Sequence, residues 1–260
     1  FFKQKTAYEI YQCDWSSDVC SSDLQYPGKT GQYFYTKFFE YYNIDAVYEP
    51  YGTNNFNKSI EQAVLDNVSG ISVSMPYKKE VLKYLDKMTS YCELYKICNT
   101  VVINDGKLVG YNCDIAGVDH VLKNIQFEDM ITILGNGAMA DMFIENLEHT
   151  QYGNLNICAR NLNSWENRNK PTEVVINCTG LGTSTRFSPF DTLPEGIRLV
   201  VDLAIPDNQL KEQCIEYGVK YINGIEFYKQ QFIKQFEVYT GIVPDSALFD
   251  KFEKQLYETI

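Results

Sequence analysis

A glycine-rich turn is the clearest chemical signal in this chain. The residues Gly135, Asn136, Gly137, Ala138, Met139 and Ala140 follow a short apolar run, MITIL, and lead into a stretch with helical spacing. A turn between a strand and a helix is typical of dinucleotide binding, because the first glycine permits a tight bend and the second lets a pyrophosphate approach the backbone. Ala140 suits the closely packed third position, and the amides at the helix start favour phosphates. Loop glycines can also serve only to make a turn, but the strand and helix here favour a cofactor site.

The residues after the next predicted strand indicate which dinucleotide this turn would hold. A carboxylate at that point accepts the ribose 2′-hydroxyl of NAD, whereas an arginine accommodates the 2′-phosphate of NADP. The strand LNICAR leads here into Arg160 and Asn161. The alternative is that Arg160 is an exposed loop arginine without a ligand. The sequence therefore favours NADP, with Arg160 and Asn161 among its binding residues.

The composition argues against several other classes of function. The 260 residues carry a formal net charge of -11, whereas nucleic acids and anionic membranes are bound by clustered Lys and Arg. No apolar run reaches the ~20 residues that span a bilayer, and the start lacks a basic region followed by a hydrophobic block. We therefore expect a cytoplasmic protein, a monomer or homodimer, that binds a small-molecule substrate and neither nucleic acid nor membrane.

Cysteine and histidine do not suggest a metal or hydrolase site. None of the eight cysteines forms a C-x-x-C pair, and neither His120 nor His149 has a candidate ligand or nucleophile near it in sequence. Six cysteines lie in apolar segments, where we interpret them as small buried thiols: Cys92, Cys98, Cys113, Cys158, Cys178 and Cys214. We predict no bound metal.

The second half of the chain has the pattern needed to position the glycine turn. A helical stretch from Asp114, DIAGVDHVLKNI, leads to the strand MITIL and the turn, and the strands LNICAR, EVVINCT and LVVDLAI follow. Short apolar strands separated by segments long enough for crossovers predict a doubly wound parallel sheet. We assign residues 114–232 to a Rossmann-type NADP-binding domain.

The first half predicts a second α/β lobe. Aromatic residues recur at helical spacing from Gly31 to Tyr42, DAVYEPY alternates as a strand, NKSIEQAVLDNVSG is a helix closed by Gly70, and ISVSM is a strand stopped by Pro76. A helix is expected over YKKEVLKYLDKM, and a tight hairpin at Asp105-Gly106 joins CNTVVIN to KLVGYN. Two amphipathic helices with core-facing Phe and Leu close the chain. The predicted fold class is a two-lobed α/β protein whose first lobe comprises residues 25–113 and 233–260.

The segment from Phe1 to Leu24 does not fit the rest of the chain. It contains the near-duplicates SSDVC and SSDL and keeps neither a strand nor a helix period. Its wording resembles translated sequencing-adapter read-through, which predicts a non-native segment and a native chain that begins near Gln25. The alternative is a genuine tail. In neither interpretation do Cys13 and Cys20 carry a function.

Several motifs together resemble the shikimate dehydrogenase family. GISVSMPYK, CNTVVIN, GYNCD, ILGNGAMA, NCTGLG and GIEFYKQQFIKQFEVYTG occur in the family's order and with similar spacing from about Asp45 onward. The Ser-Met-Pro sequence, the Ala-Arg-Asn triplet and the Gly-Ala-Met-Ala turn resemble the divergent shikimate dehydrogenase-like branch. The resemblance implies an NADP-dependent oxidoreductase of the chorismate pathway in aromatic amino acid biosynthesis. Its substrate would be 3-dehydroshikimate and shikimate, or a related hydroxylated cyclic carboxylate, bound by the first lobe.

The resemblance also implies roles for individual residues. Lys78 would be the proton-transfer residue beside the reacting carbon, and Asp114 its partner. An amine steadied by a carboxylate suits this chemistry, because hydride transfer from an alcohol requires removal of the hydroxyl proton. Asn99 and Gln231 would orient ring hydroxyls. The other residues implied are Thr30 and Ser74 at the substrate, and Asn177, Thr179, Gly182, Gly224 and Phe227 along the cofactor.

The chain departs from the family pattern at three places. The early Ser-x-Ser-Pro stretch, which grips the substrate carboxylate in the family, aligns with residues 29–32, so both serines are absent and Thr30 or Lys29 would have to replace them. The Gly-Ala before the family's Asn-Thr is Ile97-Cys98 here, and a family tyrosine is replaced by Ile205. The substrate is therefore left open between shikimate and a related compound.

Two further interpretations follow from these departures. One is an NADP-binding regulatory or catalytically impaired homologue that lost turnover along with the serines. The other is an ordinary enzyme fragment that is unstable because its own first strand is missing and the adapter-like segment only fills the gap. The presence of both Lys78 and Asp114 favours the active enzyme.

Overall fold

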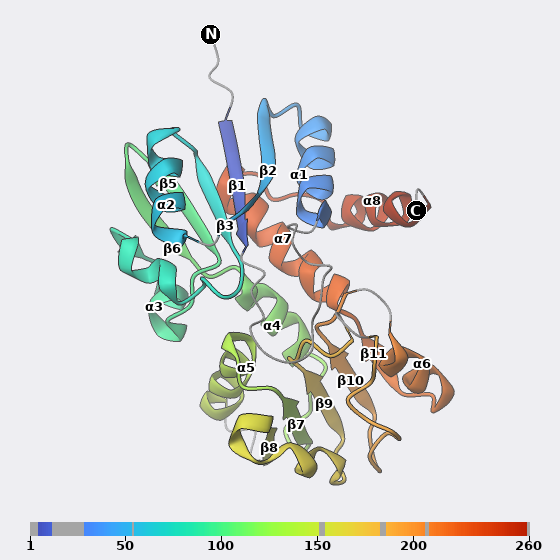
Figure 1. Cartoon of the computed structure of the whole chain (residues 1–260). Coiled ribbons are helices and arrows are strands. Elements are labelled where there is room, and N and C mark those ends of the chain that lie inside the picture. Colours follow the sequence, from blue (N-terminus) through green and yellow to red (C-terminus); the bar gives the residue numbers. More distant parts are fainter. Residues whose placement is uncertain are drawn as a thin grey trace. The chain divides into compact units, whose positions relative to one another are not determined.

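Two sheets organise the chain, one in each of two units. The computed structural model describes residues 5–11, 29–53, 55–150, 154–182, 186–205 and 208–258. Unit 1 comprises Phe1–Cys113 and Phe232–Ile260, and unit 2 comprises Asp114–Gln231. Each unit combines its sheet with helices (Figure 1), which confirms the predicted two-part α/β fold.

Unit 1 is built on a six-stranded mixed sheet with the strand order β2-β1-β3-β5-β6-β4. The first three strands in this order are parallel, whereas β5 runs antiparallel to both β3 and β6. The strands are β1 (Lys5–Tyr11), β2 (Ala46–Gly52), β3 (Gly70–Val73), β4 (Lys87–Met88), β5 (Thr100–Asn104) and β6 (Lys107–Tyr111).

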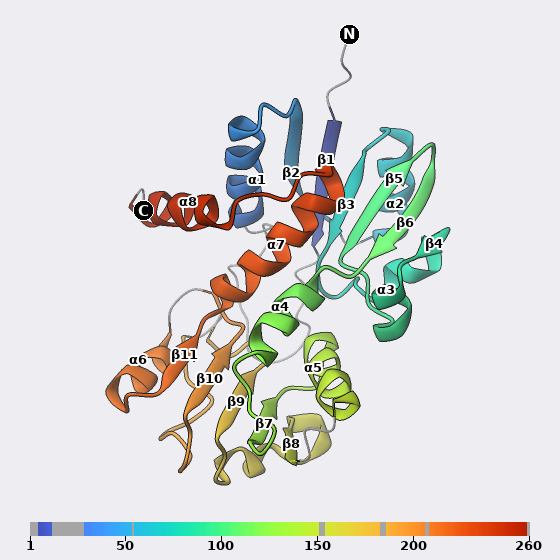
Figure 2. The same cartoon turned by 180° about the vertical axis from the view of Figure 1, so that it is seen from behind.

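The helices of unit 1 are α1 (Lys29–Tyr41), α2 (Phe56–Leu65), the 3-10 helix η1 (Glu80–Tyr84), α3 (Ser90–Tyr95) and α8 (Ser246–Glu258), together with the later part of α7 (Gly224–Thr240). The two views show α2 on one face of the sheet and α7 on the other (Figures 1 and 2). Both faces of the sheet are therefore covered.

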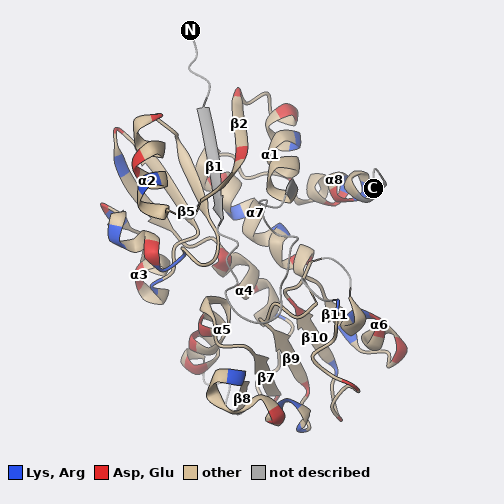
Figure 3. Ribbon diagram, in the orientation of Figure 1, with Lys and Arg blue, Asp and Glu red and all other residues tan. Residues whose placement is uncertain are grey.

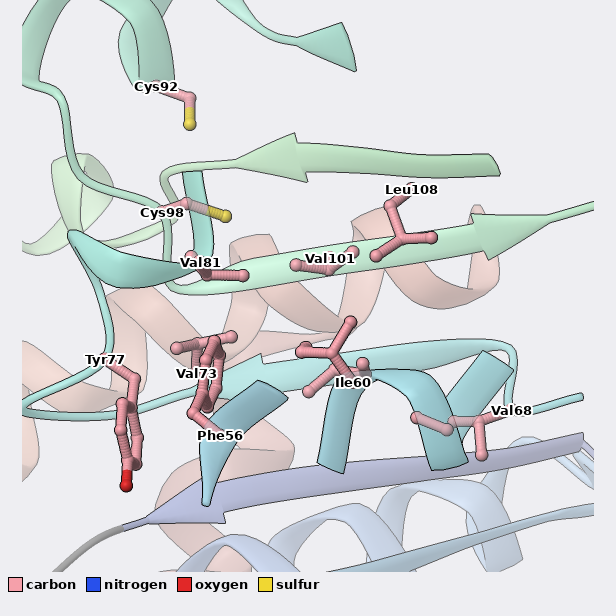
Figure 4. Close-up of a cluster of buried hydrophobic side chains, with 12 residues drawn as sticks. Phe56, Ile60, Val68, Val73, Tyr77, Val81, Cys92, Cys98, Val101 and Leu108 are labelled. Atoms are coloured by element: carbon pink, nitrogen blue, oxygen red, sulfur yellow. The ribbon is translucent and has the colours of Figure 1, made fainter. Parts of the chain in front are cut away.

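Side-chain alternation along β3 gives each face a different partner. Ile71 and Val73 join the apolar cluster beneath α2, which also contains Phe56, Ile60 and Val101 (Figure 4). Ser72 points to the other face, where its hydroxyl lies 2.9 Å from the Tyr239 hydroxyl of α7. A side chain at Gly70 would overlap the Tyr239 ring, since its Cβ would lie 2.6 Å from Cε1. The small residues of β3 thus admit a large aromatic ring.

Aromatic side chains make the second core of unit 1. The predicted face of α1 is confirmed, because Phe34 and Phe38 are fully buried and Phe39 nearly so. Phe34 stacks on Phe249 of α8 with 4.0 Å between ring centroids, and Tyr35 stacks at the same distance on Tyr48 of β2. Phenylalanines of the closing helices, among them Phe232, Phe236, Phe249 and Phe252, are buried as expected.

The structure differs from the sequence predictions at three places in unit 1. Residues 5–11, for which no element was predicted, form β1 between β2 and β3. The interpretation of residues 1–24 as non-native stays a prediction. Helix α2 ends at Leu65, because Asn67 takes a left-handed conformation with φ 55°; the expected stop at Gly70 was wrong, and Gly70 begins β3. Most of 77–88 is not a helix, since Asp86 pairs with Leu108 and draws β4 onto β6.

Unit 2 contains the predicted doubly wound parallel sheet. Its five strands are all parallel, in the order β11-β10-β9-β7-β8. They are β7 (Met130–Leu134), β8 (Asn154–Cys158), β9 (Val174–Asn177), β10 (Leu199–Asp202) and β11 (Lys220–Ile222). The connecting helices are α4 (Asp114–Leu122), α5 (Ala138–His149), η2 (Arg160–Leu162), η3 (Trp165–Asn169) and α6 (Gln209–Glu216), followed by the start of α7.

The inner strands of unit 2 are apolar and buried. Strands β7 and β9 carry no charged residue, and the charged residues of the unit lie on helices, loops and strand ends (Figure 3). Five of the six described cysteines are buried, which confirms their interpretation as core thiols, whereas Cys178 is half-buried. Among the residues that the structure describes, no helix is long and apolar enough to cross a membrane.

Candidate active site

The glycine turn lies where the sequence predicts, between β7 and α5. Gly135 has φ +103°, a conformation that favours glycine, and its N–H donates to Cys158 O of β8 at 2.9 Å. A Cβ on Gly135 would lie 3.3 Å from the Cys178 carbonyl oxygen, so the turn also packs closely against the segment after β9. The first glycine therefore allows both the bend and this close approach.

The second glycine faces open space. Gly137 caps the N-terminus of α5, and no atom lies within 4 Å of the place where its Cβ would be. Asn136 and Gly137 are exposed, Ala138 and Met139 are half-buried, and Ala140 is fully buried, as its predicted packing role requires. The backbone of this turn thus offers room and exposed amides for a pyrophosphate. Asp141 adds a negative charge in the first turn of α5, which acts against phosphate binding.

Arg160 and Asn161 lie at the same edge of the sheet as the glycine turn. Both are exposed and begin η2 directly after β8, and Cys158 at the end of β8 pairs with Leu134 at the end of β7. The carboxyl ends of neighbouring parallel strands are where doubly wound sheets bind ligands. The structure thus brings Arg160 to the edge that carries the glycine turn, as a 2′-phosphate site requires.

The buried carboxylate of Asp202 fixes the chain after β10, at the same edge of the sheet. Asp202 ends β10, has no exposed surface, and accepts hydrogen bonds from Asn177 Nδ2 (2.9 Å), Ala204 N (3.1 Å), Asn208 Nδ2 (2.7 Å) and Tyr221 Oη (2.9 Å). Four donors replace the water that burial removes from this charge. The carboxylate therefore ties together the segments after β9 and β10.

Asn177 also forms hydrogen bonds to the loop after β9, which is predicted to bind the cofactor. Its Oδ1 accepts from the Thr179 amide (3.1 Å) and hydroxyl (2.6 Å), and its Nδ2 also donates to Leu181 O at 3.2 Å. Gly182 follows with φ +94° and is buried. Burial raises the pKa of the neighbouring Cys178 thiol, and the charges of Asp202 and Asp141 raise it further, so this thiol stays neutral.

Gly224 and Phe227 lie in the first turn of α7. A Cβ on Gly224 would lie 2.6 Å from the carbonyl oxygens of both Leu203 and Ala204, so only glycine fits where the helix meets the chain after β10. Phe227 is 6% exposed and packs on Gly117 of α4, where an added Cβ would lie 2.5 Å from its ring. The predicted place of Phe227 along the cofactor stays a prediction.

In unit 1 the predicted substrate residues gather at the carboxyl end of β3. Ser74 follows β3 and Lys78 follows Tyr77, and both are half-buried. The Lys78 carbonyl accepts from Cys98 N (2.9 Å), and Asn99 O accepts from Val73 N (2.7 Å), so the lysine and the asparagine lie on neighbouring segments. Thr30 begins α1, and this helix starts at the same end of the sheet because it crosses from β1 to the parallel β2.

A buried relay of hydrogen bonds fixes the orientation of the Asn99 amide. Its Oδ1 accepts from Thr100 Oγ1 and from Cys113 N, both at 2.8 Å. Gln235 of α7 donates to Thr100 Oγ1 at 2.7 Å and accepts from the Tyr35 hydroxyl at 2.8 Å. Because Oδ1 receives two donors, Nδ2 is the end of this amide that can donate to a substrate hydroxyl.

Asp114 and Gln231 lie at the ends of unit 2. Asp114 begins α4 with no exposed surface and directly follows Cys113, whose amide holds Asn99. Gln231 is half-buried on α7, one helical turn before Gln235. Lys78 and Asp114 belong to different units, and their pairing stays a prediction.

Sequence reasoning missed the residues that support the predicted site. Asp202 ends the strand LVVD and Asn208 caps α6, and a polar residue at either position suggests only an ordinary cap. Gln235 is a signal that could have been found, because this glutamine stands among phenylalanines in an otherwise apolar, buried stripe on α7.

Comparisons with known proteins agree with the predicted resemblance. The family model for the shikimate dehydrogenase substrate binding domain matches residues 32–101, which lie in unit 1. The shikimate dehydrogenase (NADP(+)) of Methanococcus maripaludis is 29% identical over 246 residues, covering 82% of this chain and 85% of the relative. A shikimate dehydrogenase-like protein of Haemophilus influenzae is 22% identical, covering 89% and 94%.

Solved structures show the same fold. The shikimate 5-dehydrogenase of Thermus thermophilus, solved in complex with NADP(H) and shikimate, superposes with a TM-score of 0.77 at 18% sequence identity, covering 97% of this chain and 99% of that one. The resemblance to shikimate dehydrogenases and the predicted two-part fold are thereby confirmed.

Proposed function

We propose that this protein is an NADP-dependent oxidoreductase that interconverts 3-dehydroshikimate and shikimate, or a related hydroxylated cyclic carboxylate, by hydride transfer. The observation that carries the proposal is the edge of the unit 2 sheet, where the glycine turn at Gly135 and the exposed Arg160 follow neighbouring parallel strands. The Methanococcus maripaludis relative is a shikimate dehydrogenase (NADP(+)), which supports both the reaction and the cofactor.

Unit 2 has a binding edge that fits NADP. The open space at Gly137 and the amides of Ala138 and Met139 suit the pyrophosphate, while Arg160 and Asn161 suit the 2′-phosphate. The Thr179 loop and the start of α7 at Gly224 would line the rest of the cofactor. When bound, NADP supplies or accepts the hydride.

Most of the residues that would bind and orient the substrate belong to unit 1. Lys78 holds or donates the proton at the reacting oxygen, with Asp114 as its partner, because the alcohol must lose a proton when it becomes a ketone. Asn99 donates from its fixed amide to a ring hydroxyl, and Gln231 and Ser74 bind further hydroxyls.

The substrate carboxylate requires a separate binding group. Thr30 or Lys29 would receive it at the start of α1, where the helix dipole favours a negative charge. This substitution for the two family serines admits substrates other than shikimate.

We place this activity in the cytoplasm and assign it to a monomer or homodimer with a small-molecule substrate. The formal net charge of -11 opposes nucleic acid and anionic membranes as partners. A second candidate function, an NADP-binding regulatory or catalytically impaired homologue, is favoured by one observation: residues 29–32 lack both family serines.

Replacement of Lys78 separates the two functions. In the enzyme, Lys78→Ala should lower turnover of shikimate with NADP+ at least ~100-fold, since it removes the proton-transfer group, and NADPH binding should persist because the cofactor residues lie in unit 2. Lys79→Ala, at an exposed neighbouring position, is the matched control and should keep wild-type activity.

The measurement is NADPH absorbance during turnover over a panel of cyclic hydroxy acids, with calorimetric titration of NADPH. Normal turnover by Lys78→Ala would show that the proton-transfer role is wrong. Tight NADPH binding by the wild type without turnover of any compound in the panel would favour the regulatory homologue.

A further inference from the structure

The side chain of Arg160 lies beside an aromatic residue, Trp165. The guanidinium carbon of Arg160 lies 5.4 Å from the centroid of the Trp165 indole ring, within the range of a cation–π contact. The loop between them is closed on itself, because Ser164 N donates to Ala159 O (3.2 Å) and Ala159 N donates to Ser164 Oγ (3.1 Å). The backbone therefore returns to its starting point and brings the ring to the arginine.

The Trp165 indole ring is held by the core of unit 2 and by a second arginine. Trp165 packs against the buried cluster formed by residues such as Leu134, Val175 and Phe190. A second guanidinium, that of Arg168, lies 4.9 Å from the ring centroid and donates from Nη1 to the Trp165 carbonyl at 3.1 Å. Trp165 is thus fixed by the core and by Arg168.

The Arg168 side chain is itself held by hydrogen bonds and an ion pair. Its side chain is 14% exposed, and its Nε donates to Pro189 O at 2.8 Å. Its Nη1 also forms an ion pair at 3.4 Å with Glu166, whose side chain is 87% exposed. Arg168 therefore has fixed partners and serves as a support for the ring, whereas Arg160 is exposed and has the ring as its neighbour on this edge.

An exposed arginine on its own samples many rotamers, and ordering it on a ligand costs conformational entropy. A ring that holds the guanidinium before the ligand arrives removes part of that cost. The benefit applies only to a ligand that contacts the guanidinium, which for a dinucleotide on this edge is the 2′-phosphate.

We propose that Trp165 is a positioning residue that holds Arg160 ready for the 2′-phosphate and so increases the preference for NADP over NAD. This inference rests on the proposed function, because it requires a dinucleotide at the glycine turn. Discrimination between the two cofactors would then depend on Arg160 together with the Trp165 ring and Arg168, which holds that ring.

The test measures binding without turnover. NADPH and NADH are titrated calorimetrically into the wild type, Trp165→Leu, Trp165→Phe and Arg160→Ala. Trp165→Leu should weaken NADPH binding about three- to tenfold and NADH binding less than about twofold, since NADH has no 2′-phosphate. Trp165→Phe keeps a ring and should stay within about twofold of the wild type for both. Arg160→Ala should weaken NADPH far more than NADH.

A second readout does not depend on any variant of Trp165. The chain has two tryptophans, so Trp15→Phe leaves Trp165 as its fluorophore. NADP+ should change the emission of Trp165 in this background, because the 2′-phosphate would bind the Arg160 guanidinium that lies over the ring. NAD+ at saturation should leave the emission nearly unchanged.

Three results would overturn the inference. A wild-type NADPH preference in Trp165→Leu, or a fluorescence response that is the same for NADP+ and NAD+, would refute it while the proposed function stands. Failure of the wild type to bind NADPH would refute both.

Discussion

Replacing Asp202 by asparagine tests whether a buried carboxylate supports the edge of the unit 2 sheet that carries the glycine turn. Each oxygen of this carboxylate accepts two hydrogen bonds: Oδ1 from Asn177 and Ala204, and Oδ2 from Asn208 and Tyr221. Asp202→Asn keeps the shape of the side chain but turns one oxygen into an NH₂ group. Whichever way the new amide faces, that group meets two donors and cannot accept from them.

The magnitude follows from the bonds that are lost. Two hydrogen bonds disappear inside a region with no exposed surface, and a buried polar group left without a partner costs about 1–3 kcal/mol. The Tyr221 hydroxyl can rotate to accept from the new amide, which offsets part of the loss. We expect the free energy of unfolding to fall by about 2–4 kcal/mol. NADPH binding should weaken as well, since Asn177 positions the Thr179 loop.

Urea unfolding and NADPH titration measure the two effects. Tyr221→Phe is the graded control, because it removes a single bond from the same carboxylate and should cost about 1 kcal/mol. Asp119→Asn, at an exposed position on α4, should leave stability unchanged. An unfolding free energy for Asp202→Asn within about 0.5 kcal/mol of the wild type would show that the carboxylate does not hold this edge together.

Two other predictions concern the stability of the units. Burial raises the pKa of the Cys214 thiol to about 12, whereas in the unfolded chain it ionises near 9. Below pH ~8.5 the thiol keeps its proton in both the folded and the unfolded state, and stability is not affected. As pH rises toward 12, only the unfolded chain loses this proton, so the free energy of unfolding falls. When the pH is raised from ~7 to ~10, the free energy of unfolding of Cys214→Ala should therefore fall by about 1–2 kcal/mol less than that of the wild type. Urea unfolding measures both, and an equal fall in the two proteins would contradict this. Deletion of residues 1–24 removes β1, which pairs with β2 and β3, and should lower the melting temperature by more than ~5 °C; an unchanged calorimetric melt would mean that β1 does not hold the sheet.

The sequence predicted best where a motif is contiguous. The hairpin at Asp105-Gly106 formed as expected, because two adjacent residues with positive φ, 50° and 74°, define the turn locally. The glycine turn and Arg160 were likewise found, since the turn directly follows β7 and Arg160 comes two residues after the end of β8. In these places the determining residues lie within a few positions of one another.

Predictions failed where distant residues decide the structure. The helical period of 77–88 was overridden because Asp86 pairs with Leu108, 22 residues later, and β4 joins the sheet. Asp202 likewise binds partners 25, 6 and 19 residues away in Asn177, Asn208 and Tyr221, so no local pattern marks it. Local spacing reports amphipathicity, but it does not report which strand a segment will join.

The discontinuity of unit 1 sets an order of events during synthesis. Unit 2 is one continuous stretch, Asp114–Gln231, so all of its strands have been made before the chain is finished. Unit 1 needs Phe232 and Phe249 from the end of the chain to pack on Phe34 of α1. Its parallel strand pairs also join residues about 40 and about 60 positions apart, which is the kind of long-range contact that slows folding. On the ribosome, unit 2 can therefore fold first, while unit 1 must wait with the aromatic face of α1 uncovered until Phe232 and Phe249 have emerged.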